Sequence, residues 1–228
     1  SPIGSILCAK LSLNDMMLVL KTIFCLSLLF CGGLSVAEPA QPSWQLKIDR
    51  IGIQVFQQQQ AGFKQKHSKG VMVVKAQSEQ VMQLLQDLSL CSQWLYGCLS
   101  ATRHDDGLIH IVVKGPLWFK DRDVVFASER RHLKASDQWL ITTDNQPTMH
   151  PNSNYVRVNT IHATWILTTI NSKKIQISYE FYVDPQIKLK SGVNKYNRDA
   201  LFLTLRRLRK LLRKSAVNQA SNPNQPKP

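Results

Sequence analysis

The residues whose types and spacing best suit chemistry are Asp121, Arg122 and Asp123, which stand side by side at the start of an apolar run. Two carboxylates beside a cation have the composition of a general acid/base set. At the beginning of a strand, however, the same residues are typical of a structural ion pair or a turn cap. We favour this structural role for them.

Other catalytic and metal-binding patterns are absent from the sequence. No Gly-x-Ser-x-Gly elbow and no phosphate-binding glycine loop occurs. The histidines are scattered without the spacing of a metal site; they are His67, His104, His110, His132, His150 and His162. We therefore expect no catalytic residue, no metal and no cofactor, and we predict that the protein is not an enzyme.

The most apolar segment of the chain, residues 18–37, has the pattern of an export signal. It carries Lys21 near its start and ends in Ser35-Val36-Ala37, whose small side chains suit a signal peptidase. We expect cleavage after Ala37 and a periplasmic or secreted protein, so residues 1–37 are excluded from the fold. A retained anchor helix is the alternative, because the run is only slightly shorter than the ~20 residues that span a bilayer.

Removal of this leader leaves Cys91 and Cys98 as the remaining cysteines. In an exported protein, an even pair this close favours a disulfide that closes a short loop and contributes about 2 to 3 kcal/mol. Two buried thiols are the alternative. A zinc site is excluded because no second pair of Cys or His stands at ligand spacing.

The elements that must position these residues are mainly strands. A helix from about Ser78 to Leu88, with Ser78 as its N-cap, and a shorter turn through Cys91 to Leu95 interrupt them early. Asp105-Asp106-Gly107 is a hairpin signal. The last strand alternates apolar and polar residues, which indicates one buried and one wet face. The predicted strands are 44–47, 51–56, 70–75, 99–104, 108–114, 123–133, 138–143, 156–170 and 174–184.

A long amphipathic helix follows the strands over residues 192–214, and at about 1.5 Å per residue it would be roughly 33 Å long. Residues spaced about 100° apart around the helix axis form an apolar stripe of Val193, Asn197, Ala200, Leu201, Thr204, Leu205, Leu208, Leu211 and Leu212. After Pro185 stand eleven basic residues and one acid, a net +10 of the chain's +14. The helix is therefore both a core element and the main source of positive charge.

This order of elements predicts an α+β domain over residues 38–214, in which a curved antiparallel sheet packs against one long helix. A chain of 228 residues with 43% hydrophobic content is large enough for a sizeable core in one domain. Residues 215–228 are polar and contain prolines, so we expect a disordered tail.

Several motifs, in this order, resemble the steroidogenic-acute-regulatory-related lipid transfer (START) family in a bacterial exported version. They cover roughly Trp44 to Lys214, and each alone would be weak. They are Lys69-Gly70, the CSQWLYGC sequence from Cys91 to Cys98, Gly115-Pro116 through Asp121-Arg122-Asp123-Val124-Val125, Trp165, Tyr179 to Asp184-Pro185, and the terminal helix. After Asp184-Pro185 the family often has a glycine pair, where this chain has Gln186-Ile187.

The resemblance implies a helix-grip fold (START/Bet v 1-like), in which the sheet wraps the C-terminal helix and encloses a cavity for one lipid or other hydrophobic ligand. The expected ligand-binding residues are Val112, Trp118, Phe126, Trp165, Ile177, Tyr179, Phe181, Asn197, Leu201, Thr204, Leu205 and Leu208. For any single apolar residue among them, plain core packing is the alternative. Sterol-binding members carry an acid and an arginine in the cavity, and Val112 and Ser128 stand nearest those positions, which argues against a sterol.

Asn197 and Thr204 interrupt the apolar stripe, and a buried polar group without a partner costs on the order of 1 to 3 kcal/mol. They either pair with the sheet backbone or meet the polar end of a bound lipid. The basic face of the helix predicts transient contact with an anionic membrane surface. Its expected membrane-facing residues are Phe202, Arg206, Arg209, Lys210 and Arg213. A neighbouring loop that covers Phe202 is the alternative.

Nucleic-acid binding is the other class that a pI of ≈ 9.8 suggests. We expect no nucleic-acid partner, because the charge lies on a helix needed for the core and no aromatic RNA-binding signature or zinc-finger spacing is present. We predict a monomeric carrier or sensor of a lipid-like molecule. A helix-grip enzyme, such as a cyclase or hydrolase acting on a bound hydrophobic substrate, is the second hypothesis, since fold alone does not exclude it.

Overall fold

The computed structural model describes residues 43–115 and 119–221, with side chains up to Ser215. The expected leader, Trp118 and the last part of the expected tail, residues 222–228, lie outside the described residues. Within those ranges, no helix is both long enough and apolar enough to cross a membrane.

The described residues form one 10-stranded sheet, which is antiparallel except where β8 pairs with β6. The strands are β1 (Gln45–Arg50), β2 (Ile53–Gln58), β3 (His67–Val74), β4 (Cys98–Arg103), β5 (Ile109–Val113), β6 (Arg122–Leu133), β7 (Gln138–Asn145), β8 (Val156–Arg157), β9 (Thr160–Asn171) and β10 (Lys174–Asp184). Across the sheet the order is β1-β2-β3-β10-β9-β7-β6-β5-β4. The edge strands are therefore β1 and β4, and β10, the last strand along the chain, lies near the middle.

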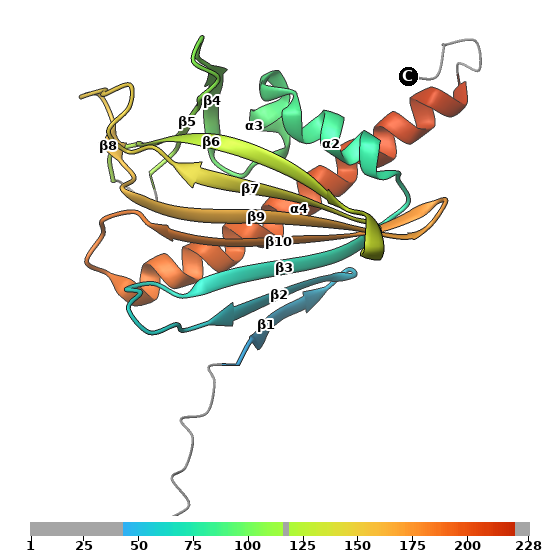
Figure 1. Ribbon diagram of the computed structural model, residues 1–228. Coiled ribbons are helices and arrows are strands. Elements are labelled where there is room, and N and C mark those ends of the chain that lie inside the picture. The colour runs from blue at the N-terminus through green and yellow to red at the C-terminus, as the bar shows by residue number, and fades with distance from the viewer. Residues whose placement is uncertain (1–42, 116–118, 222–228) are drawn as a thin grey trace, which may run out of the picture. The chain divides into compact units, whose positions relative to one another are not determined.

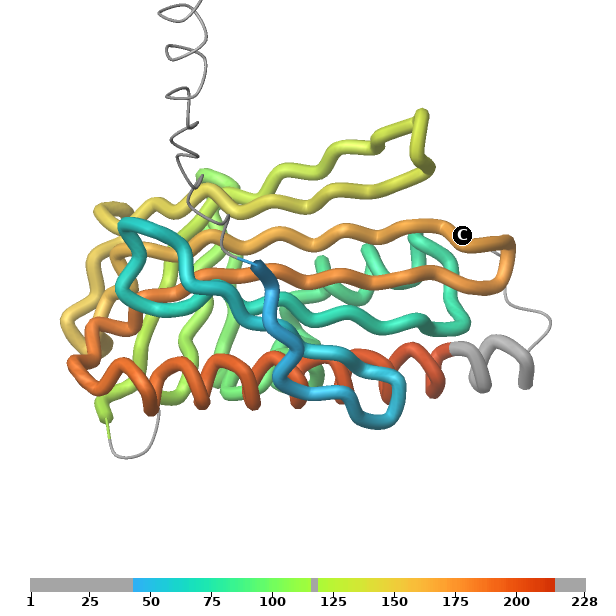
Figure 2. Tube along the Cα trace, turned by 90° about the horizontal axis from the view of Figure 1, so that it is seen from below, coloured from blue at the N-terminus to red at the C-terminus, as the bar shows by residue number. Residues whose placement is uncertain are grey.

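Helices occupy two places along the chain. A helical insertion between β3 and β4 consists of α2 (Ser78–Gln86), a 3-10 turn (Leu88–Leu90) and α3 (Cys91–Trp94), and the domain ends with α4 (Lys190–Ser221). Figures 1 and 2 show α4 running along one face of the curved sheet. The expected fold class, a curved antiparallel sheet wrapped around a long C-terminal helix, is confirmed.

Gly70 in β3 explains how the helix lies so close to the sheet. A Cβ atom at this position would collide with Leu205 and crowd Leu201. The missing side chain therefore lets α4 pack against the strand. Leu201, Leu205 and Leu208 are at most 1% exposed, and the core that they join also contains Ile53, Met72, Val81, Leu167, Ile175 and Ile177.

The first helix begins and ends differently from the prediction. Its N-cap is Gln77 and not Ser78, because the Gln77 backbone N–H donates a hydrogen bond to Gln80 Oε1 at 2.9 Å. It ends at Gln86, because the side chain of Asp87 accepts a hydrogen bond from the next turn and caps that turn separately.

The C-terminal helix is longer than predicted at both ends. It starts at Lys190 and continues past Lys214 to Ser221, over residues that the sequence assigned to a disordered tail. Polar composition alone does not stop a helix, and the first proline after Lys214 is Pro223.

The outer face of β10 is drier than its alternating pattern predicted. Tyr182 is 3% exposed, and its ring centroid lies 4.6 Å from that of Phe63 and 4.9 Å from that of His67. Phe63 comes from the polar connection between β2 and β3. The alternation within β10 could not reveal that Phe63 covers Tyr182, because Phe63 belongs to a segment far away in the sequence.

Asp121 and Asp123 both hold structural positions. The buried carboxylate of Asp123 accepts hydrogen bonds from Arg157 Nη2 at 2.8 Å and Nε at 3.1 Å, and it lies 3.0 Å from His110 Nε2. Arg157 also donates to backbone carbonyls of the loop after β7, those of Pro147, Met149 and His150. Asp121 accepts from the Gly115 backbone N–H at 2.9 Å. The Asp123–Arg157 pair thus fastens this loop to β6. The hydrogen bond between Asp121 and Gly115 holds Gly115 near the start of β6.

Candidate functional site

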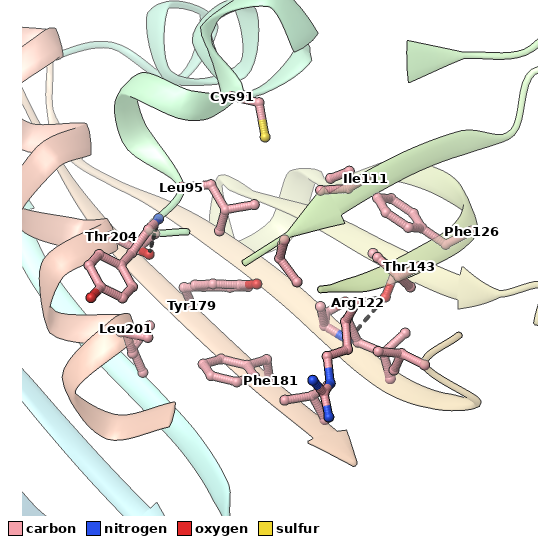
Figure 3. A pocket seen from close by; sticks show the side chains of 18 of the residues that line it. Cys91, Leu95, Ile111, Arg122, Phe126, Thr143, Tyr179, Phe181, Leu201 and Thr204 are labelled. Carbon is pink, nitrogen blue, oxygen red and sulfur yellow. Dashed lines mark hydrogen bonds between the residues drawn. The ribbon is translucent and has the colours of Figure 1, made fainter. Parts of the chain in front are cut away.

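A cavity of ≈ 240 Å³ lies between the inner face of the sheet, α3 and the first half of α4 (Figure 3). Strands β5, β6, β7, β9 and β10 supply most of its wall, and the segment from Cys91 to Tyr96 lies over it. Cys91 and Cys98 form the predicted disulfide, with their Cα atoms 6.0 Å apart. The disulfide fixes the covering segment to the start of β4.

The cavity takes up only one half of the space between α4 and the sheet. Along α4 its lining ends at Thr204, and Leu205 and Leu208 beyond it pack in the solid core. Small side chains mark the hollow half, since Ala163 and Thr143 face the cavity from neighbouring strands. Such side chains are too short to meet α4, and the space between them stays open.

Some of the expected ligand-binding residues line the cavity, and others lie in the solid half of the core. Those that line the cavity are Phe126, Trp165, Tyr179, Phe181, Asn197, Leu201 and Thr204. Ile177, Leu205 and Leu208 do not line it, because they fill the solid half of the core. Trp118 lies outside the described residues.

Val112 was placed on the wrong face of its strand. The cavity is lined by Ile111 and Val113 of β5, and alternate residues of a strand point to opposite faces. The sequence held the signal for this, because Val112 alternates with them and shares its face with the polar His110. Ser128, the other position compared with the sterol-binding pattern, does line the cavity.

Arg122 is a lining residue that the sequence reasoning missed. It was grouped with Asp123, but adjacent residues of β6 face opposite sides, so Asp123 points away from the cavity while Arg122 points into it. Its Nε and Nη2 each lie 3.3 Å from the Pro185 carbonyl oxygen, and Nη1 donates to the Lys120 carbonyl. Burial lowers the pKa of its guanidinium, against the opposing effect of the Asp121 charge.

The remaining polar groups of the wall differ in how well they are paired. Thr204 Oγ1 accepts a hydrogen bond from the Tyr96 backbone N–H at 3.1 Å, so it joins α4 to the covering segment. Trp94 Nε1 and Asn197 Nδ2 are buried and have no hydrogen-bond partner among the described residues. Burial raises the pKa of the Tyr179 hydroxyl, whose ring stacks on Trp165 at 3.8 Å between centroids. This hydroxyl is therefore uncharged.

A second hollow, of ≈ 350 Å³, adjoins the cavity at the first turns of α4. The two share Tyr96, Val193, Tyr196 and Ala200 as wall residues. Its outer wall includes Ile187 and Leu189, and Leu189 is 56% exposed. This hollow thus connects the cavity wall with an exposed apolar edge.

The basic side of α4 lies beside the β1–β2 hairpin, which passes over the helix in Figure 2. Arg209 Nη1 donates to the Ile51 carbonyl at 2.6 Å. We call the groove between them the basic groove; its residues are Ile51, Leu203, Arg206, Arg207, Arg209, Lys210, Arg213 and Lys214. Burial, Arg213 and Arg206 all lower the pKa of Arg209.

Phe202 is wrongly placed in the membrane-facing set. It is 6% exposed and belongs to the main core, and the Arg50 guanidinium lies 5.1 Å from its ring centroid. The hairpin therefore covers it, as the alternative interpretation required. Arg206, Lys210 and Arg213 are exposed, while Arg209 is half-buried. The exposed apolar residue of this face is Ile51, at 61%.

No model of a known protein family matches the sequence, and no curated protein matches it either. Solved structures do match. A STAR-related lipid transfer protein from Xanthomonas axonopodis has a TM-score of 0.67 at 21% identity, over 75% of this chain and 98% of that one. Human STARD10 has a TM-score of 0.64 at 18% identity, over 78% of this chain and 76% of that one. Human StAR-related lipid transfer protein 5 has a TM-score of 0.66 at 13% identity, over 89% of this chain and 99% of that one.

These identities are low, so the comparisons establish a shared architecture and leave the ligand open. The sheet order, the helical insertion and the long terminal helix agree with the architecture that the sequence motifs suggested. The chain has the helix-grip fold of the STAR-related lipid transfer domains.

Proposed function

We propose that this protein binds one lipid or other hydrophobic small molecule inside the domain. The observation that carries the proposal is the unfilled cavity of ≈ 240 Å³, whose wall is mostly aliphatic and aromatic. Burial of apolar ligand surface at about 25 cal/mol per Å² would drive binding. The neighbours named above as lipid transfer proteins share the fold, and a pocket of this kind is the usual site of a small ligand.

The ligand enters, in this proposal, at the first turns of α4. The second hollow adjoins the cavity there and has the exposed Leu189 on its rim. The loop after β7 is a less suitable route, because Arg157 binds three of its backbone carbonyls.

The basic groove is the proposed contact with an anionic membrane surface. Arg206, Lys210 and Arg213 project into solvent, and each cation near an anionic surface contributes about 1 kcal/mol of attraction. Ile51 lies at the hairpin tip with φ of 51°, a conformation that is a strained outlier for a β-branched residue. An exposed isoleucine within a cationic groove has the composition of an interfacial anchor. It replaces Phe202 in this role.

The carrier acts, as we propose it, without catalysis, as a monomer in the periplasm or outside the cell. A disulfide such as Cys91–Cys98 suits an oxidising compartment. The absence of catalysis is supported by Asp123, whose carboxylate is engaged by Arg157 and His110 on the side away from the cavity.

Native mass spectrometry of the purified mature chain, followed by organic extraction, tests the ligand proposal. We expect a stoichiometric hydrophobic molecule that survives desalting and is released by denaturation. A homogeneous apo mass, together with no uptake of any lipid from mixed vesicles, would contradict it.

Vesicle co-sedimentation tests the membrane contact. Reversal of Arg206, Lys210 and Arg213 to Glu removes about 1 kcal/mol for each cation and adds repulsion, so binding to phosphatidylglycerol vesicles falls roughly 100-fold or more. The matched control reverses Arg131, Lys134 and Lys173, which are exposed on other elements, and leaves the same net charge. Equal losses in both variants would mean that overall charge, and not the basic groove, binds the vesicle.

A further inference from the structure

The wall of the cavity holds N–H donors that lack an acceptor among the described residues. Arg122 contributes a guanidinium, and Trp94 Nε1 and Asn197 Nδ2 are buried N–H donors without a partner. No Asp or Glu belongs to the described wall of the cavity. A molecule that completes these groups must bring acceptor oxygens, because an unpaired buried donor is unfavourable.

The positive charge of Arg122 indicates that this molecule should be an anion. It is 5% exposed, and no carboxylate lies within 4.0 Å of its guanidinium among the described residues. Both acids adjacent to Arg122 in sequence make other hydrogen bonds: Asp121, whose charge acts on Arg122 from a distance, accepts from the Gly115 backbone N–H, and Asp123 is engaged by Arg157 and His110. A buried cation without a counter-ion is unfavourable unless an anion joins it.

The guanidinium also has donors to spare. It carries five N–H groups, and three of them donate to the carbonyls of Pro185 and Lys120. One N–H on each terminal nitrogen remains. These remaining donors suit the oxygens of a carboxylate or phosphate.

The position of Arg122 places this charge near the mouth of the cavity. Its carbonyl partner Pro185 lies two residues before Ile187, which lines the adjoining hollow, and its partner Lys120 follows Phe119 of the same hollow. In Figure 3 the Arg122 side chain lies at the opposite end of the pocket from Cys91. Lys114 is exposed and lines the cavity as well. The deep part of the cavity is left to apolar side chains such as Ile109, Ile111 and Phe126.

We propose that the ligand is a single-chain amphiphile with an anionic head, which Arg122 and Lys114 hold at the mouth while the chain fills the cavity. This inference rests on the proposed function. The chemistry fits two sources, a fatty acid carboxylate and the phosphate of a monoacyl lipid.

The size and the aromatic geometry of the site argue against other lipids. The cavity of ≈ 240 Å³ is small, which favours a ligand with one chain over a ligand with two. A cationic head would be repelled by Arg122, and the facing sides of the Trp165 and Tyr179 rings are closed to it by their stacking.

Isothermal titration of the delipidated mature chain with four probes of equal chain length tests the head group. The probes are dodecanoate, dodecyl phosphate, dodecanol and dodecylamine. We expect one or both anions to bind roughly 10- to 100-fold more tightly than the alcohol, the range for a hydrogen bond to a charged group. The stronger anion identifies the source. Equal affinity for alcohol and anions, or preference for the amine, would overturn this inference and leave the carrier function standing, whereas no binding by any probe would refute both.

Two substitutions assign the selectivity to the named residues. Arg122→Gln removes the guanidinium, and the ratio of dodecanoate to dodecanol affinity should fall to near one. Because Arg122 also binds the Pro185 carbonyl, Lys114→Gln provides a second variant whose side chain is exposed; its ratio should fall several-fold. The control Lys173→Gln lies outside the cavity wall and keeps the full ratio. Wild-type selectivity retained in both cavity variants would refute the assignment.

Discussion

Filling the cavity from its own wall should stabilise the empty protein and abolish ligand binding. Ala163 on β9 is 6% exposed and faces the cavity. Ala163→Leu adds about three methyl or methylene groups, and at about 0.8 kcal/mol for each buried group the gain is about 2 kcal/mol. For a domain of this size, about 2 to 4 °C in Tm accompany each kcal/mol, so the melting temperature should rise by about 4 to 8 °C. Affinity for a twelve-carbon amphiphile should fall more than about 10-fold, since the new side chain takes the space of the ligand chain.

The control for this variant is Val55→Leu, in the solid half of the core. Val55 is fully buried against α4 and is not part of the cavity wall, so one added methylene should cost about 1 to 3 kcal/mol through overpacking. Thermal unfolding of the delipidated proteins, followed by circular dichroism, compares the two. If Ala163→Leu destabilises the protein as much as Val55→Leu, no free space exists at Ala163 and the argument for a ligand cavity is refuted.

Three further predictions concern the parts that hold the site. Replacing Cys91 and Cys98 together by Ser removes a link across seven residues and should lower the free energy of unfolding by about 2 kcal/mol; equal chemical stability of both proteins without reductant would contradict this. Asp123→Asn breaks the buried pair with Arg157 and should cost about 3 kcal/mol while leaving ligand affinity unchanged, and weakened binding by the folded variant would count against the structural role. Burial, and secondarily the charge of His162, lower the pKa of His67. The unfolded chain therefore binds the proton better, and stability present above about pH 6.5 should fall on acidification; a His67→Phe variant with an equally steep loss would exclude His67 as the cause.

The sequence predicts the architecture well because its main signals are periodic. Alternation in residues 174–184 and the helical stripe from Val193 to Leu212 each describe one element and its buried face. The glycine at position 70 joins them, since only a residue without Cβ lets α4 lie on β3. Each of these signals is formed by residues close together in the chain, and such patterns can be recognised in a single sequence.

The extent of the cavity could not be read in the same way. Leu201 and Leu205 are identical in type and share a stripe, yet the first lines the cavity and the second is packed solid. The difference lies in the facing strands: Gly70 brings β3 against Leu205 and the near side of Leu201, whereas Ala163 and Thr143, on strands farther across the sheet, are too short to reach the first turns of α4. Which residue faces which across a sheet is set by strand order, and strand order is not periodic in the sequence.

The burial of Arg122 has a physical consequence for how the apo and bound states differ. The empty protein holds a cation and two unpaired donors in its interior, which the apolar burial around them must offset. An anionic head group would supply a counter-ion to Arg122, so part of the affinity comes from a charged group that is unfavourable without the ligand. The same reasoning explains why Asp123 faces the other way: had it paired with Arg122 inside the cavity, the charge would be neutralised and the site would lose its preference for an anion. The alternation of β6 thus separates a structural carboxylate from a guanidinium that lines the cavity, at adjacent positions.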